Sequence, residues 1–128
     1  MIILMGGIVL SVLLGQGEFK YRVIEDWAKL PDEWSFMDVA GVAVNSKDEV
    51  FVFNRGEHPM IIFDIKGNYL RSWGENLFSR PHGIHIGPDD NIYCTDDGDH
   101  TVKKISPDGK LIFQIGVPGR PSEFMSNL

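Results

Sequence analysis

The sequence predicts an all-β fold, a β-propeller of four-stranded blades that is incomplete, with about two blades plus flanking strands. Two observations predict it. The sequence repeats itself without a gap at an offset of 42 residues, and each repeat divides into four short apolar runs separated by turn residues. Four strands in about 42 residues is the period of a propeller blade. Neither repeat contains a stretch with the 3.6-residue periodicity of a helix.

The repeat matches residues 41–74 to residues 83–116. Between the turn residues, which stay in phase, apolar residues face apolar residues: Val42 with Ile84, Val44 with Ile86, Val50 with Ile92, Phe51 with Tyr93, Phe63 with Ile105 and Leu70 with Ile112. The identical pairs are Gly41 with Gly83, Asp48 with Asp90, Gly56 with Gly98, His58 with His100, Gly67 with Gly109 and Gly74 with Gly116. We therefore interpret residues 18–128 as a partial propeller with blade units at 41–74 and 83–116.

The second run of each unit, residues 50–53 and 92–95, is apolar at consecutive positions. This pattern predicts an inner strand that is covered on both sides by neighbouring blades. Turn residues at 46–49 and 87–91 close the first hairpin of each unit. The third hairpin closes at 64–68 and 106–110, where a glycine supplies a positive φ.

The flanks of the two units also carry a pattern. Residues 18–25 alternate like a lone strand, with Phe19, Tyr21 and Val23 on one face. Residues 117–128 read as the connector to a further blade. A propeller needs at least four blades to close, so we expect a fragment of a longer protein or half of an assembly. Such a chain would associate with the missing blades or with itself.

Residues 1–17 carry no charged side chain. The apolar run of about 14 residues is short for a membrane span, which needs roughly 20, so no stable span is expected. It also lacks a basic n-region and an A-x-A cleavage site. Three alternatives stay open: an export or anchor segment, which would make the protein secreted or membrane-anchored; part of a buried strand; or upstream sequence from a wrongly assigned start.

Composition narrows the class of partner. The 128 residues include 12 basic and 18 acidic side chains, which gives a net charge of -6 and argues against nucleic acid as a partner. The one cysteine, Cys94, excludes an internal disulfide and a CxxC metal site, and its place in the repeat is that of a small core residue.

The two units serve as controls for each other. His58 and His100 occupy equivalent places and are interpreted as structural. His82 replaces Ala40 and His85 replaces Ala43, so both depart from the repeat. Strand alternation puts these two histidines on opposite sides. His82 begins the strand that lines the channel and is a candidate ligand, whereas we expect His85 to be packed and hydrogen-bonded.

Charged residues of the loop after the second strand also differ between the units. Arg55 faces Asp97 across the repeat. A guanidinium there either pairs with a local carboxylate such as Glu57 or reaches toward a carboxylate ligand. The acidic cluster Asp96, Asp97 and Asp99 lacks the spacing of a calcium-binding loop, which favours a role in forming the turn.

Three stretches resemble a known family: VFVFNRGEHP (residues 50–59), NLFSRPHGIHI (76–86) and IYCTDDGDHTVKKISPDGK (92–110). They resemble NHL-type propellers, in particular peptidyl-alpha-hydroxyglycine alpha-amidating lyases and their microbial relatives. The resemblance covers roughly residues 38–116. It implies a six-bladed propeller that cleaves the C–N bond of a peptidyl-alpha-hydroxyglycine to give an amidated peptide and glyoxylate, so the substrate would be a small peptide-like molecule.

The resemblance also implies roles for four residues. His82 matches the first of three histidines that hold zinc at the channel mouth, and Arg55 matches an arginine that contacts the substrate. Val42 and Ile84 match positions whose backbone carbonyls help to hold a structural calcium. The other two zinc histidines, a catalytic tyrosine and a calcium aspartate would lie in later blades, so the 128 residues alone are expected to be inactive.

Two other functions remain open beside the lyase. One is a non-catalytic NHL propeller that binds a protein or a small ligand, because one fold supports many functions. The other is a calcium-dependent lactone hydrolase of related architecture. That alternative is disfavoured because Ala40 and His82 stand where such a site needs carboxylates.

Overall fold

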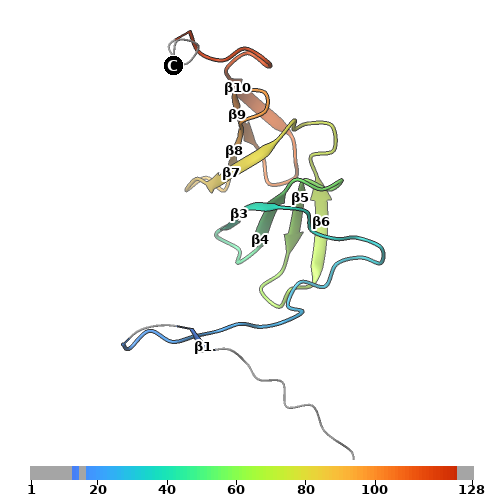
Figure 1. Ribbon diagram of the computed structural model, residues 1–128, viewed down its shortest axis with the longest axis vertical. Coiled ribbons are helices and arrows are strands. Elements are labelled where there is room, and N and C mark those ends of the chain that lie inside the picture. The colour runs from blue at the N-terminus through green and yellow to red at the C-terminus, as the bar shows by residue number, and fades with distance from the viewer. Residues whose placement is uncertain (1–12, 15–16, 124–128) are drawn as a thin grey trace, which may run out of the picture.

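The computed structural model describes residues 13–14 and 17–123 (Figure 1). All regular elements in these residues are β-strands. The described residues contain no helix long and apolar enough to cross a membrane. Two four-stranded antiparallel sheets lie next to each other along the long axis of the molecule. The all-β prediction is confirmed, and the two sheets are the two predicted blades.

Each blade is a simple meander in which every strand pairs with the next. The first blade contains β3 (Val39–Val44), β4 (Val50–Asn54), β5 (Met60–Phe63) and β6 (Tyr69–Trp73). The second contains β7 (Pro81–Ile86), β8 (Ile92–Asp96), β9 (Thr101–Ile105) and β10 (Leu111–Ile115). The strands therefore repeat at the offset that the sequence predicts.

Turn residues with positive φ set the hairpins at equivalent places. Asp48 and Asp90 have φ of 59° and 58° in the first hairpin of each blade. Gly67 and Gly109 have φ of 79° and 90° in the third hairpin. Left-handed backbone favours glycine and, after it, aspartate and asparagine, so these identical pairs of the repeat are explained by backbone geometry.

The larger core lies between the two blades. Four side chains of the first blade are fully buried in it, Phe51, Phe53, Met60 and Ile62. They meet Ile92, Cys94 and Ile105 of the second blade, with Ile84 and Ile86 of β7 packed against them. Gly41 lets β7 approach closely, since an added Cβ there would lie 2.9 Å from Cγ2 of Ile84. One face of the inner strand β4 is thus covered by the second blade, as its consecutive apolar residues predict.

A second cluster covers the other face of the first blade. Val52, Ile61 and Phe63 are buried there beneath side chains from the segment that precedes the blade: Trp27, Ala28, Leu30, Trp34 and Phe36. Trp27 donates its indole N–H to the carbonyl of Ile65 at 3.2 Å, and Trp73 donates in the same way to Pro107 at 3.3 Å. These tryptophans pack the blades.

The predicted strand at residues 18–25 is shorter than its alternation indicates. Only β2 (Tyr21–Arg22) forms, and it pairs with β1 (Leu13–Leu14). Phe19, Tyr21 and Val23 are exposed, because the described residues place no blade against them. Most of residues 1–17 lie outside the described residues, as do residues 124–128 of the predicted connector.

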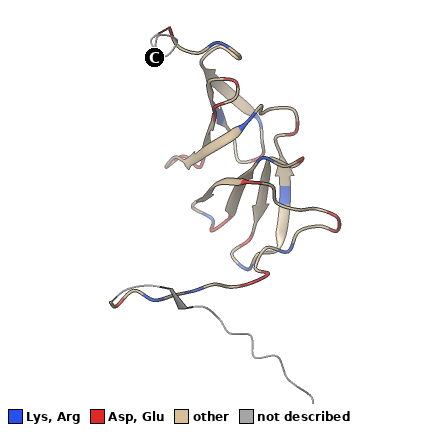
Figure 2. Cartoon of the chain, in the orientation of Figure 1, with Lys and Arg blue, Asp and Glu red and all other residues tan. Residues whose placement is uncertain are grey.

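Charged residues are spread over both blades (Figure 2). Acidic residues stand mainly in the loops, whereas basic residues occur in both strands and loops.

Candidate functional site

The candidate site lies where β7 begins, between the loop that follows β4 and the loop that follows β8. His82 is the second residue of β7. The strand register moves by two residues on β7 but by one on β8 between the pairs Pro81 with Asp96 and Gly83 with Thr95. His82 is therefore the extra residue of a β-bulge, a device that redirects a side chain.

The same bulge occurs in both blades, so it is a feature of the blade fold and does not depend on His82. In the first blade the register shifts in the same way between the pairs Val39 with Asn54 and Gly41 with Phe53, which makes Ala40 the extra residue. The second blade places an imidazole at this shared irregularity. Simple strand alternation cannot assign the side of His82, and the predicted alternation holds only from Gly83 onward.

Arg55 reaches from the loop after β4 to the second blade. Its Nε donates to the main-chain carbonyl of Pro81 at 3.0 Å, the residue directly before His82. Its Nη1 lies 3.9 Å from Oδ2 of Asp38. The nearby carboxylate is therefore Asp38, and not Glu57 as one of the two alternatives proposed. The structure brings Arg55 and His82, the two side chains singled out from the sequence, to the same end of the blades.

The ion pair of Arg55 has a counterpart of reversed sign. Asp38 and Arg80 occupy equivalent positions of the repeat, and so do Arg55 and Asp97. Arg80 Nη1 lies 3.1 Å from Asp97 Oδ2. Each blade thus ties the loop after its second strand to the chain that enters its first strand. The sequence contains a signal for both ion pairs: at the 42-residue offset, the acidic and the basic member of the pair swap positions between the two blades.

His82 is accessible. Its side chain is 61% exposed, and its Nε2 lies 4.0 Å from Oδ2 of Asp97, which is beyond hydrogen-bond distance. Asp97 itself accepts a hydrogen bond from Arg80. The imidazole therefore stands at the surface beside one carboxylate, in a position from which it can bind a ligand or a metal ion.

His85 is exposed, so the prediction of a packed, hydrogen-bonded histidine is wrong. Its ring lies 6.3 Å from that of Tyr93 on the same blade. The reason is that His85 lies on the face of the second blade that no other described residue covers, whereas the first blade has β7 against the corresponding face.

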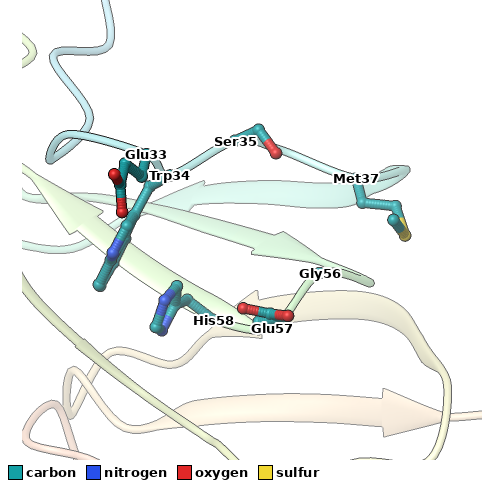
Figure 3. A pocket seen from close by; sticks show the side chains of 7 residues that line it. All are labelled: Glu33, Trp34, Ser35, Met37, Gly56, Glu57 and His58. Carbon is teal, nitrogen blue, oxygen red and sulfur yellow. The ribbon is translucent and has the colours of Figure 1, made fainter.

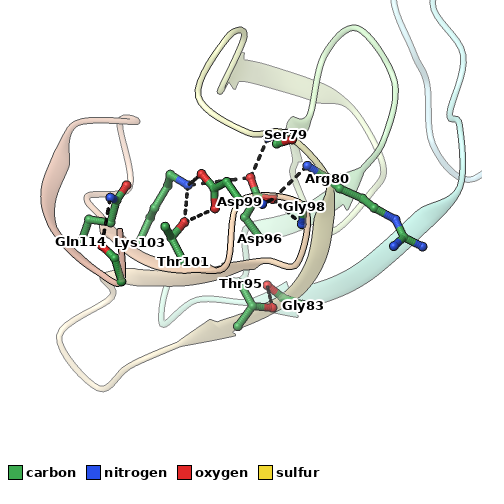
Figure 4. A network of polar contacts seen from close by, with 11 residues as sticks. Ser79, Arg80, Gly83, Thr95, Asp96, Gly98, Asp99, Thr101, Lys103 and Gln114 are labelled. Atoms are coloured by element: carbon green, nitrogen blue, oxygen red, sulfur yellow. Dashed lines mark hydrogen bonds and ion pairs between the residues drawn. The ribbon is translucent and has the colours of Figure 1, made fainter. Parts of the chain in front are cut away.

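Asp96 forms the turn after β8, as predicted for the acidic cluster (Figure 4). Its carboxylate accepts main-chain N–H groups of Ser79 at 2.6 Å and Arg80 at 2.9 Å, and further ones within the turn. Burial opposes ionisation, but these hydrogen bonds outweigh it and lower the pKa of Asp96. Lys103, which is also buried, lies 3.7 Å from this carboxylate and 2.7 Å from that of Asp99.

His58 has the structural role that the repeat predicts. Its ring stacks on Trp34 at a centroid distance of 3.4 Å, and its Nδ1 lies 3.0 Å from Oε1 of Glu75. The hydrogen bond to His58 lowers the pKa of Glu75. A cavity of about 240 Å³ opens beside the stack, and its lining residues are Glu33, Trp34, Ser35, Met37, Gly56, Glu57 and His58 (Figure 3).

Cys94 is a buried core residue, as predicted. Burial raises the pKa of its thiol to about 12. Because the thiolate is the reactive form, this raised pKa disfavours Cys94 as a nucleophile at neutral pH.

The site and the fold can now be compared with known proteins. No family model matches the chain. Peptidylglycine alpha-amidating monooxygenase of Rattus norvegicus is 31% identical over 122 residues, with 73% of this chain and 12% of that protein covered. NHL repeat-containing protein 3 of Homo sapiens is 30% identical over 118 residues, with 84% of this chain and 33% of that protein covered. The two sheets are blades of an NHL-type propeller.

Another relative matches a shorter part of the chain. Peptidyl-alpha-hydroxyglycine alpha-amidating lyase 1 of Drosophila melanogaster is 38% identical over 58 residues, with 43% of this chain and 11% of that protein covered. The chain spans a third or less of the length of the three relatives named here.

Proposed function

We propose that these NHL-type blades form part of an amidating-lyase-like propeller, in which Arg55 and His82 face the substrate. One observation carries the proposal: Arg55 hydrogen-bonds the carbonyl of Pro81, the residue before His82, so the two side chains come to one end of adjacent blades. The relatives named as amidating lyases and monooxygenases support the same activity class.

In this proposal, Arg55 binds the carboxylate of a peptidyl-alpha-hydroxyglycine. Its Nε is held by Pro81, which leaves the Nη groups to meet an anion. A guanidinium binds a carboxylate through two parallel hydrogen bonds. Asp38, at 3.9 Å from Nη1, forms only a loose pair that a substrate carboxylate can replace. Fixing the acid end of the substrate would orient the C–N bond that is cleaved.

His82 fits a zinc site as one exposed imidazole ligand. Within residues 13–14 and 17–123, no group of three or more His, Cys, Asp or Glu side chains could hold a metal ion. The remaining ligands would therefore come from other blades. When bound, zinc supplies a Lewis acid that polarises the substrate oxygen.

Val42 and Ile84 fit the proposed calcium role by their position. They are equivalent residues of β3 and β7, and each of these strands is the edge strand of its sheet. An edge strand presents main-chain carbonyls that pair with no neighbouring strand, and calcium accepts carbonyl oxygens as ligands.

The zinc content of the protein that carries the complete propeller tests the assignment of His82. We expect about one zinc ion per propeller, and a strong loss of zinc in His82→Ala. His85→Ala is the matched control, because His85 is an exposed histidine of the same strand. An unchanged zinc content in His82→Ala would refute the ligand role.

A second candidate is a non-catalytic NHL propeller that binds a partner. The observation in its favour is that NHL repeat-containing protein 3, whose name carries no activity, matches 84% of the chain. In that case Arg55 has a structural role alone: it pairs with Asp38, as Asp97 pairs with Arg80, and it ties the first blade to the carbonyl of Pro81. Release of glyoxylate from a peptidyl-alpha-hydroxyglycine separates the two candidates.

A further inference from the structure

Asn54 is the last residue of β4 and stands directly before Arg55. Its polar side chain is fully buried. Its Oδ1 accepts the main-chain N–H groups of Gly56 at 2.9 Å and of Met37 at 3.4 Å. Its Nδ2 donates to the main-chain carbonyl of His58 at 2.8 Å. One buried amide therefore joins the loop after β4 to the chain that enters β3.

These hydrogen bonds enclose the main chain of Arg55. Gly56 follows Arg55 in the sequence, and the carbonyl of Met37 accepts the main-chain N–H of Arg55 at 2.8 Å. There is little room at this point, since an added Cβ on Gly56 would lie 2.7 Å from Oδ1 of Asn54. The side chain of Arg55 donates to the carbonyl of Pro81 at 3.0 Å from this main chain. Its direction therefore depends on where Asn54 holds the loop.

The second blade holds the equivalent loop with charged groups. Asp96 takes the place of Asn54 in the repeat, and its carboxylate accepts main-chain N–H groups at the entry of its own blade. Lys103 is also buried and lies 3.7 Å from this carboxylate. The counterpart of Lys103 in the first blade is Ile61. The two positions thus differ together: the second blade has an ion pair where the first has an amide and an apolar side chain.

An amide can hold such a loop without a buried charge, because it both donates and accepts hydrogen bonds. A carboxylate at position 54 could not donate to the carbonyl of His58 and would need a buried cation. We propose that Asn54 is the positioning residue of Arg55: its hydrogen bonds fix the main chain from which the guanidinium meets a carboxylate. The identity of that carboxylate, the acid end of a peptidyl-alpha-hydroxyglycine, rests on the proposed function.

Glyoxylate release by the protein that carries the complete propeller tests the proposal through Asn54→Ala. A side chain that binds the substrate equally in the ground state and the transition state contributes to KM and not to kcat. We therefore expect KM to rise at least about 10-fold, with kcat within about twofold of the unmodified protein.

Asn45→Ala is the matched control. Asn45 is a buried asparagine at the opposite end of β4, and its Oδ1 accepts the main-chain N–H groups of Lys47 and Glu49 in the turn before that strand. Its loss removes hydrogen bonds of the same kind from the same blade. Asn45→Ala should therefore leave KM unchanged.

The Nε–H of Arg55 gives a readout that needs no substrate. This group donates to Pro81, which slows its exchange with solvent. We expect the exchange, followed by NMR, to accelerate at least about 10-fold in Asn54→Ala and to stay unchanged in Asn45→Ala. Arg55→Lys removes the signal and so identifies it.

A double variant, Asn54→Asp with Ile61→Lys, copies the second blade and provides a rescue. The first blade already contains the counterparts of the aromatic and acidic neighbours of Lys103, which are Phe36 and Glu57. Asn54→Asp alone should raise KM as Asn54→Ala does, and the double variant should return KM to within about threefold of the unmodified protein. Circular dichroism verifies that each variant folds, and Asn54→Ser replaces Asn54→Ala if that variant does not.

Two kinds of failure are distinguishable. An unchanged KM or an unchanged exchange rate in Asn54→Ala, or equal changes in Asn45→Ala, would overturn the role of Asn54 and leave the proposed function standing. An unmodified protein that releases no glyoxylate would overturn the proposed function, and the exchange of the Arg55 Nε–H then decides alone whether Asn54 positions Arg55.

Discussion

Arg55 and Asp97 show how one position of a blade serves two purposes. Both residues pair with an opposite charge at the chain entry of their own blade, Asp38 or Arg80. Only Arg55 also reaches the next blade, through the carbonyl of Pro81. Both blades contain the ion pair, so it is a feature of the fold. The hydrogen bond to the residue before His82 is made by Arg55 alone of these two residues.

The ion pair of Glu49 and Arg71 provides a test of the described contacts at residue scale. Arg71 donates to both carboxylate oxygens of Glu49, at 2.8 and 2.9 Å. Hydrogen bonding to Arg71 outweighs desolvation and lowers the pKa of Glu49 to about 2 from 4.5. Glu49→Gln should therefore lower the free energy of unfolding by about 1 kcal/mol at neutral pH, after screening of a partly exposed pair.

The sign of the pH dependence follows from the lowered pKa. The stabilisation is fully present above pH 4.5 and is lost as the pH falls toward 2. Denaturant unfolding at several pH values measures it. The difference between wild type and Glu49→Gln should shrink over that interval, and a difference that stays constant would contradict the assignment.

At the scale of elements, the segment before the first blade takes the place that β6 and its connector take for the second blade. Trp27 and Trp73 donate their indole N–H groups to equivalent turn residues, Ile65 and Pro107. Lys29 N–H also donates to the carbonyl of Gly67 at 2.8 Å. A blade of this fold thus depends on the segment that precedes it to cover its outer part.

Two glycine substitutions test how firmly this segment is seated. Gly67 and Gly119 both have positive φ, 79° and 73°. An added Cβ would lie 1.8 Å from the carbonyl oxygen of Trp27 at Gly67, but would meet nothing within 4 Å at Gly119. Gly119→Ala should cost roughly 1 kcal/mol from backbone strain alone, and Gly67→Ala more than roughly 3 kcal/mol because the segment must move.

Chemical denaturation followed by tryptophan fluorescence measures both variants. Equal effects of the two substitutions would mean that the segment does not pack on the turn as described.

The elements that repeat were the ones that could be predicted from the sequence. The strands, the turns at Asp48 and Gly67 and the buried run of β4 follow from two units that agree. What lies outside the units could not be predicted. The stacking of Trp34 on His58 involves a tryptophan that lies outside the repeat units. The bulge at His82 and the exposure of His85 depend on strand register and on neighbouring blades, which residue types do not encode locally.

At the scale of the whole molecule, the described residues form two blades of a propeller and include Arg55 and His82, the two side chains of the proposed site. Arg55 and His82 lie at the same end of the blades, while the further zinc ligands of the proposed site would come from blades beyond those described. The function of the protein is therefore decided by whether these two side chains act on a substrate or only stabilise the loops.

The most direct test of the proposed function is the release of glyoxylate from a peptidyl-alpha-hydroxyglycine by the protein that carries the complete propeller. The proposal predicts zinc-dependent release that falls by at least about 100-fold in His82→Ala, and that remains in His85→Ala. No release from the zinc-loaded protein, or equal release from His82→Ala, would contradict it.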